Sequence, residues 1–175
     1  MDGKIKCWGS NNHGQLGDGT TSGSTSPVEV SGITTATSVA TGPAYFFSCA
    51  LLTDGKVMCW GYNNVGQLGD STTNDRYKAV EVDGITTATS VALGSSHACA
   101  LLQDGKIKCW GENNNGQLGD GTTTRRSIPV EVNNITTATS VASGSWQTCA
   151  MLTDGKVMCW GYNYDTSPEE VSGIT

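Results

Sequence analysis

The residues in this chain best placed to do chemistry are its seven cysteines, and six of them fall into three matching pairs. The two cysteines of a pair are ten residues apart and enclose an Asp-Gly dipeptide, as in "CALLTDGKVMC" from Cys49 to Cys59. Two thiols at one fixed spacing can form a disulfide, contribute to a zinc site or stay as buried free thiols. The choice between these depends on the backbone that carries them.

The stretch between the two cysteines predicts a β-hairpin whose turn length fixes the pairing. A two-residue turn at Asp54-Gly55 would place Cys49 opposite Trp60, and no disulfide could form. A three-residue turn, with Gly55 left-handed as a bulge, places Cys49 opposite Cys59, where cross-strand Cβ atoms lie about 4.5–5.5 Å apart. The bulged turn therefore predicts one disulfide in each copy: Cys49–Cys59, Cys99–Cys109 and Cys149–Cys159.

Buried free cysteines stay an open alternative, because a free cysteine packs as a small apolar residue. Zinc is disfavoured, since separate hairpins with only His13 and His97 to help do not build a four-ligand site. We predict no metal and no cofactor. Cys7 is expected to be unpaired, because the strand carrying its partner would lie before residue 1. Repeated disulfides indicate an extracellular or periplasmic protein, although this chain carries no signal peptide.

The other reactive residue types indicate structure and not catalysis. Asp54 and its counterparts each precede a turn glycine. The "NNHGQLGDGT" stretch from Asn11 lacks the acidic alternation of a calcium loop and predicts a hydrogen-bonding loop. His97 has no acid at a diagnostic spacing and is predicted to lie in a surface loop. We therefore predict no catalytic residues and no enzyme.

These residues recur because the chain is built from a repeat. Cys-Trp-Gly returns at intervals of 52, 50 and 50 residues. Each full repeat holds four short β-type runs, such as "ATSVA", "CALL", "KVMCWG" and "PVEV", separated by Gly, Asn, Asp, Thr and Ser clusters. Four strands in about 50 residues match the strand number and the length of one β-propeller blade.

The prediction is an all-β fold of β-propeller blades, each of four antiparallel strands, with about three and a half blades in one repeat domain. The half-blade spans 1–31, and the blade repeats span 32–83, 84–133 and 134–175, the last of them shortened. A ring that stops there exposes an apolar flank at each end. We expect self-association through these flanks, or a longer chain that covers them.

Composition disfavours two classes of partner. A net charge of -6 and a pI near 4.7 disfavour nucleic acid, because its binding depends on Lys and Arg. No apolar run approaches the roughly 20 residues that span a bilayer. The expected partner is another protein or a second copy of this chain.

The fixed order of "GQLGDGTT" at Gly14 and Gly116, "DGKVMCWG", and "GSSHACALL" from Gly94 resembles the repeat of the regulator of chromosome condensation family. The resemblance covers essentially the whole chain and implies part of a seven-bladed type of propeller. It implies activity less clearly, because the family includes a guanine-nucleotide exchange factor for a small GTPase and secreted binding proteins, one of them an inhibitor of β-lactamases. The nuclear members typically lack the paired cysteines.

Variation within the repeat marks the candidate binding residues. Between the "SVA" and "CALL" runs the copies read "GPAYFFS", "GSSHA" and "GSWQT", and aromatic residues in exposed loops are typical interface anchors. Packing between blades is the open alternative. The partner-binding candidates are Tyr45, Phe46, Phe47, His97, Trp146 and Gln147. A second variable set holds Arg76, Tyr77, Lys78, Arg125 and Arg126.

The sequence thus predicts a non-enzymatic, extracellular protein-binding or scaffold module. A self-assembling structural subunit is the alternative. Nucleotide exchange and enzyme inhibition follow only from the resemblance, and the disulfide pattern disfavours exchange.

Overall fold

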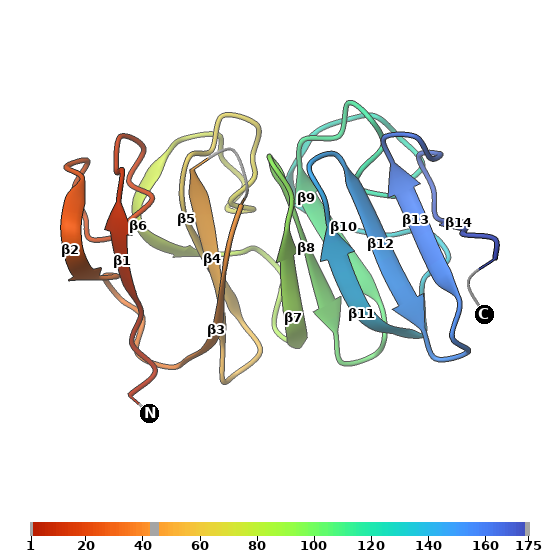
Figure 1. The fold of residues 1–175 in the computed structure, drawn as a ribbon, viewed down its shortest axis with the longest axis horizontal. Helices are drawn as coiled ribbons and strands as arrows, with labels where there is room; N and C mark the ends of the chain where they lie inside the picture. The colour runs from red at the N-terminus through yellow and green to blue at the C-terminus, as the bar shows by residue number, and fades with distance from the viewer. Residues whose placement is uncertain (1, 43–45, 174–175) are drawn as a thin grey trace.

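The chain folds as a row of antiparallel sheets in the computed structural model, which describes residues 2–42 and 46–173 (Figure 1). One sheet has two strands, and three have four strands each in the orders β3-β4-β5-β6, β10-β9-β8-β7 and β11-β12-β13-β14. The predicted all-β fold of four-stranded blades is confirmed. The strands are β1 Lys6–Gly9, β2 Ser24–Glu29, β3 Ala36–Thr41, β4 Phe47–Leu52, β5 Val57–Gly61, β6 Arg76–Glu81, β7 Ala88–Leu93, β8 His97–Leu102, β9 Ile107–Gly111, β10 Arg126–Glu131, β11 Ala138–Ser143, β12 Gln147–Leu152, β13 Val157–Gly161 and β14 Glu169–Glu170.

The hairpin at the centre of each blade has the predicted bulged turn. Gly55 has a φ of 79°, a left-handed conformation that glycine adopts without a steric penalty. The Leu52 N–H donates to the Lys56 carbonyl at 2.9 Å, which closes the three-residue turn. Cys49 consequently lies directly opposite Cys59.

All three predicted disulfides are present. Cys49–Cys59, Cys99–Cys109 and Cys149–Cys159 each join two strands of one blade, with a Cα–Cα distance of 4.1 Å in every case. Cys7 is a free, half-buried thiol. The disulfides therefore staple each blade internally.

The tryptophan of each Cys-Trp-Gly joins a blade to the sheet before it. The indole N–H of Trp60 donates to the Gln15 carbonyl at 2.9 Å, and Trp110 and Trp160 make the corresponding bonds to Gln67 and Gln117 at 3.0 and 2.9 Å. All three of these tryptophans are fully buried. A buried indole N–H needs such a partner, so the bond fixes the spacing between neighbouring sheets.

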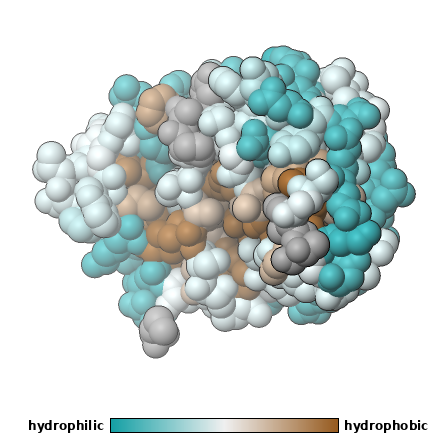
Figure 2. Space-filling view, turned by 45° about the vertical axis from the view of Figure 1, so that its right-hand side comes forward, coloured by the Kyte–Doolittle hydropathy of each residue, from teal (hydrophilic) through white to brown (hydrophobic). Residues whose placement is uncertain are grey.

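The two ends of the row of sheets leave apolar residues uncovered. Leu51 and Leu101 are 7% and 5% exposed because the next blade covers them, whereas Met151, at the same repeat position, is 45% exposed. At the other end Val39 is 50% and Trp8 63% exposed. Figure 2 shows apolar side chains reaching the surface in a band across the middle of one face. Within the described residues, no helix is long and apolar enough to cross a membrane.

Candidate binding site

The described residues of the variable loops lie along one edge of the blades, at the top of Figure 1. In each blade the loop between the first two strands is tied to the residue after Cys-Trp-Gly by a backbone hydrogen bond. These bonds run from Tyr62 N to Phe46 O at 3.1 Å, from Glu112 N to Ser96 O at 2.9 Å and from Tyr162 N to Trp146 O at 2.9 Å. We call the surface made by these six residues the loop face.

Adjacent sheets make the loop face continuous. The His13 ring, from the half-blade, stacks on Phe46 with centroids 5.8 Å apart and meets the Tyr62 ring edge-on at 4.4 Å. Between the second and third blades, the Ser95 N–H donates to the Ser145 carbonyl at 3.2 Å. The loops are thus held by neighbours in sequence-distant sheets.

Aromatic side chains stand exposed at both ends of the loop face. Phe46 is 50%, Trp146 48% and Tyr162 49% exposed, and the rings of Trp146 and Tyr162 meet edge-on at 5.8 Å. Mutual packing limits the rotamers of these side chains, so a partner would order them at a reduced entropic cost. The arrangement suits binding of a complementary apolar surface.

Paired polar side chains occupy the rest of this edge. Glu112 pairs with Arg125 at 2.9 Å in the middle blade, and His13 Nδ1 lies 2.9 Å from Asp75 Oδ2 beside the first. Asp75 also accepts from the Asn63 N–H at 2.9 Å, which orients its carboxylate. The polar side chains along this edge are therefore engaged by neighbours within the fold. A partner would meet aromatic rings and paired polar groups in alternation.

The structure separates the predicted binding residues into exposed and buried ones. Phe46, Trp146 and Gln147 are exposed. The prediction that Phe47 and His97 lie on the surface is wrong, because these residues are 1% and 0% exposed. Each stands two residues before the first cysteine of its pair and so shares the strand face that the next blade covers. Gln147 holds the same position in the last blade, whose outer flank is open, and Tyr45 lies outside the described residues.

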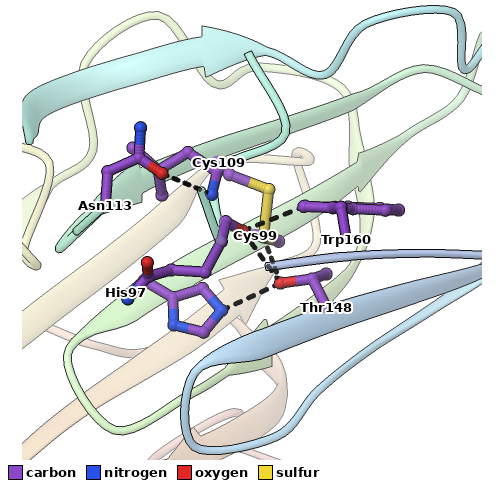
Figure 3. The surroundings of a disulfide bond; sticks show 8 residues. His97, Cys99, Cys109, Asn113, Thr148 and Trp160 are labelled. Atoms are coloured by element: carbon purple, nitrogen blue, oxygen red, sulfur yellow. Dashed lines mark hydrogen bonds between the residues drawn. A yellow bond between two sulfur atoms is a disulfide. The ribbon is translucent and has the colours of Figure 1, made fainter. Parts of the chain in front are cut away.

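His97 is the most unusual polar residue of the fold (Figure 3). Its Nε2 lies 2.9 Å from Thr148 Oγ1 in the next blade, and Thr148 donates its own proton to the Gln117 carbonyl at 3.1 Å. Nε2 must then carry the imidazole proton, and no described residue hydrogen-bonds to Nδ1. Burial lowers the pKa of His97 from 6.5 to about 4, so it is a neutral packing residue.

The asparagine loops are hydrogen-bonding centres, as the sequence predicts. The Asn63 amide donates to Asp70 Oδ1, the Thr72 carbonyl and the Asn74 carbonyl at 3.0–3.2 Å, and its carbonyl accepts from Leu68 N–H at 3.0 Å. Asn11 and Asn113 repeat this pattern. Across the described residues, no group of three or more His, Cys, Asp or Glu side chains could hold a metal ion.

The second variable set, which includes Arg76, Tyr77 and Arg126, also contains both structural and exposed residues. Arg76 and Arg126 pair with Asp70 and Asp120 of these loops at 2.6 and 2.9 Å and are structural. Tyr77 is 46% exposed on β6 and is not one of the six loop-face residues. Sequence reasoning missed Tyr62, Tyr162 and His13. The first two could have been found, because the residue after Cys-Trp-Gly varies between Tyr62, Glu112 and Tyr162 inside a nearly constant segment.

Four-stranded antiparallel blades that follow one another in chain order define a β-propeller fold. Two sequence models of the regulator of chromosome condensation (RCC1) repeat match the chain, one at residues 2–51, 54–101 and 104–151 and the other at 36–67, 88–117 and 138–165. The chain belongs to the RCC1 repeat family.

Solved structures agree on the fold. Human WBSCR16 is similar with a TM-score of 0.85 at 22% identity, over 98% of this chain and 48% of that one. Yeast RCC1 (Prp20), in a crystal structure with Kap60, is similar with a TM-score of 0.81 at 23% identity, over 98% of this chain and 45% of that one. The chain therefore spans about half of these propellers.

Curated relatives match a smaller share of their own length. The human probable E3 ubiquitin-protein ligase HERC3 is 40% identical over 102 residues, which are 55% of this chain and 9% of HERC3. The mitochondrial RCC1 domain-containing protein RUG3 of Arabidopsis thaliana is 30% identical over 96 residues, 54% of this chain and 21% of RUG3.

Proposed function

We propose that this chain is a non-enzymatic protein-binding module that contacts its partner through the loop face. The observation that carries this proposal is the exposure of Phe46, Trp146 and Tyr162, each close to half, on loops that a rigid frame holds. Exposed aromatic residues are the commonest anchors of protein interfaces. We expect the loop face to bind a partner whose surface has apolar pockets spaced to match these aromatic side chains.

The chemistry of the described residues supports binding over catalysis. His97 is buried and neutral, and His13 is engaged by Asp75 and two aromatic rings. HERC3 is described as a probable ligase, but the matched part is 9% of it, so we do not carry ligase activity over to this chain. Nucleotide exchange is likewise not proposed.

We further propose that the protein works in an oxidising compartment, extracellular or periplasmic. Three disulfides, one per blade, support this, because structural disulfides persist where thiols are not kept reduced.

A self-assembling subunit is a second candidate, and the open flanks favour it. Met151 at one end and Val39 and Trp8 at the other are about half exposed or more, and Leu51 and Leu101 show that the Met151 position is buried when a blade packs on it. Copies stacked flank to flank would bury these side chains.

The test of the loop face is affinity capture from the extracellular or periplasmic fraction of the source cells, followed by measurement of the dissociation constant of the captured partner. Trp146→Ala should weaken binding by about 1–4 kcal/mol, the range of interface hot spots, without changing the thermal unfolding temperature. Tyr77→Ala is the matched control, because Tyr77 is an exposed aromatic residue that is not one of the six loop-face residues and lies on a different blade from Trp146. Equal losses in both variants, or a Trp146→Ala protein that unfolds, would overturn the assignment.

A further inference from the structure

Trp146 and Tyr162 form an exposed aromatic corner on the loop face of the last blade. Their ring centroids are 5.8 Å apart, and the ring planes meet at 67°. The two side chains are 48% and 49% exposed. The other two complete blades have residues at the same positions, so the repeat shows what this corner can hold.

In the first blade the corner is filled from within the chain. The His13 ring stacks on Phe46 and meets the Tyr62 ring edge-on, and its Nδ1 lies 2.9 Å from Asp75 Oδ2. Tyr62, against which His13 packs, is half-buried. The fold thus places a planar, nitrogen-bearing ring against two aromatic rings, with a carboxylate beside the nitrogen.

The middle blade has no aromatic residue at these positions. Glu112 pairs there with Arg125 at 2.9 Å. Val65, which holds the position of His13, is 8% exposed. The groups of this corner are therefore also engaged within the chain.

In the last blade a smaller side chain takes the place of the imidazole. Asn115 holds the position of His13, and in both residues the backbone N–H donates to Oε1 of the glutamine two residues on, at 2.9 Å. An asparagine amide is smaller than an imidazole and has no aromatic face. Tyr162 is exposed, whereas Tyr62 beside His13 is half-buried. The last corner therefore leaves aromatic surface that a partner could cover.

A carboxylate lies close to this corner in the sequence. The Asp165 carbonyl accepts from the Gly161 N–H at 3.0 Å, in the way that Arg76 pairs with the equivalent glycine of the first blade. Tyr164, which is 38% exposed, consequently stands where Asp75 stands in the first blade. The Asp165 side chain is exposed, and among the described residues it hydrogen-bonds only to its neighbour in the chain. No described cation neutralises it.

These features favour a cation, and in particular a guanidinium group. The faces of Trp and Tyr rings attract a cation that lies within about 6 Å of the ring centroid. The exposed carboxylate of Asp165 and the net charge of -6 favour the same sign. Guanidinium is planar, as the imidazole of His13 is, and it stacks on aromatic rings while its N–H groups point outward.

We propose, on the basis of the function proposed above for the loop face, that the corner of Trp146 and Tyr162 is the subsite for an arginine side chain of the protein partner. The guanidinium stacks in the corner as the His13 ring does in the first blade. The carboxylate of Asp165 attracts its charge.

The test uses a blocked pentapeptide, Gly-Gly-Arg-Gly-Gly, and protein labelled with ¹⁵N in the indole groups of its five tryptophans. The Trp146 signal is identified by its loss in Trp146→Ala. We expect the arginine peptide to shift this signal saturably and to leave the signals of the buried Trp60, Trp110 and Trp160 unchanged. The same peptide with citrulline, which has the shape of arginine without its charge, should give no saturable shift. A lysine peptide should bind about threefold or more weakly than arginine, because an ammonium group does not stack.

Two pairs of variants test the place of binding. Asn115→His should weaken arginine binding by about fivefold or more, because its imidazole competes for the corner from within the chain. Asn114→His is the matched control, since Asn114 is exposed and adjacent, and it should bind normally. Phe46→Ala changes the equivalent residue of the first blade and should also bind normally, whereas Tyr162→Ala should lose the saturable shift.

Equal shifts with the arginine and citrulline peptides would overturn the proposal, as would equal binding of lysine or unchanged binding in a folded Asn115→His protein. The titration needs no partner, so its outcome is separate from that of the capture experiment. If the arginine peptide fails to bind while Trp146→Ala still weakens the captured partner, the loop face stands and the arginine subsite is wrong.

Discussion

Asn63 shows how one buried side chain organises a loop that has little regular structure. Its amide and carbonyl together bond four groups of the loop, and the same arrangement recurs at Asn11 and Asn113. A loop without a sheet ladder must satisfy its backbone groups in some other way, and here one asparagine does so. The sequence predicted this role, because the loop recurs with almost the same letters in three repeats.

Replacing Asn63 with alanine should therefore lower the free energy of unfolding by about 2–4 kcal/mol, because two or more buried hydrogen-bonding groups lose their partner. Asn64→Ala is the matched control, since Asn64 is exposed and adjacent, and it should change stability little. Chemical denaturation of the two variants measures the difference. Similar stabilities would show that water replaces the amide without penalty.

His97 makes the stability depend on pH. Its pKa is about 4 in the folded chain and 6.5 ordinarily, so between these values the unfolded chain binds a proton that the folded chain does not. The contribution of neutral His97 is complete above pH 6.5 and is lost as pH falls towards 4, by an amount on the order of 3 kcal/mol.

Phenylalanine is the natural replacement for His97, because Phe47 fills the same position in the first blade and Gly42 and Gly94 make room for the two rings. In His97→Phe the loss of stability on acidification should be smaller across this window, while stability at neutral pH is retained. Urea titrations at several pH values give the comparison. The same dependence on pH in both proteins would assign the effect to other groups.

At the scale of the element, the sequence could predict features that depend on a few neighbouring residues, and it could not predict features that depend on the packing of another blade. The register of the hairpin depends on Thr-Asp-Gly-Lys alone, so Cys49–Cys59 could be placed before any packing was known. The burial of Phe47 and His97 depends on a neighbouring blade. Period-two alternation from Cys49 and Cys99 was the available signal for it, and reading these residues as part of the loop concealed that signal.

The disulfide of the middle blade should stabilise the chain by limiting its unfolded state. The double variant Cys99→Ala/Cys109→Ala should lose about 3 kcal/mol, as the chain-entropy estimate gives for a loop of this length. Cys7→Ala is the control and should lose much less, since Cys7 closes no loop. Peptide mapping without reductant should find the three predicted pairs, and thiol labelling of all seven cysteines in the folded, unreduced protein would contradict them.

At the scale of the whole molecule, the phase of the repeat determines which surfaces are open. The chain opens on the third and fourth strands of a blade and ends with a complete blade, so one end sheet has two strands and the other has four. The sequence predicted two open flanks for this reason. It could not predict how exposed each flank residue is, because exposure depends on how neighbouring sheets pack.

The exposed flanks are the feature that distinguishes this chain from a closed ring. Leu51 and Leu101 are 7% and 5% exposed between blades, whereas Met151, at the same repeat position, is 45% exposed at the end. The difference is the part of the side chain that a neighbouring blade would cover. Patches of this kind rarely persist on a monomer in water. We expect the 175-residue chain to associate through them, and Met151→Asp to weaken the association by placing a charge on the flank.

The most direct test of this account is the mass of the native particle, measured by light scattering on the purified 175-residue chain over a range of micromolar concentrations. Open blades predict a mass above 18.2 kDa that rises with concentration and falls back in Met151→Asp. A monodisperse particle of 18.2 kDa at every concentration would show that water tolerates the open flanks and would contradict the account.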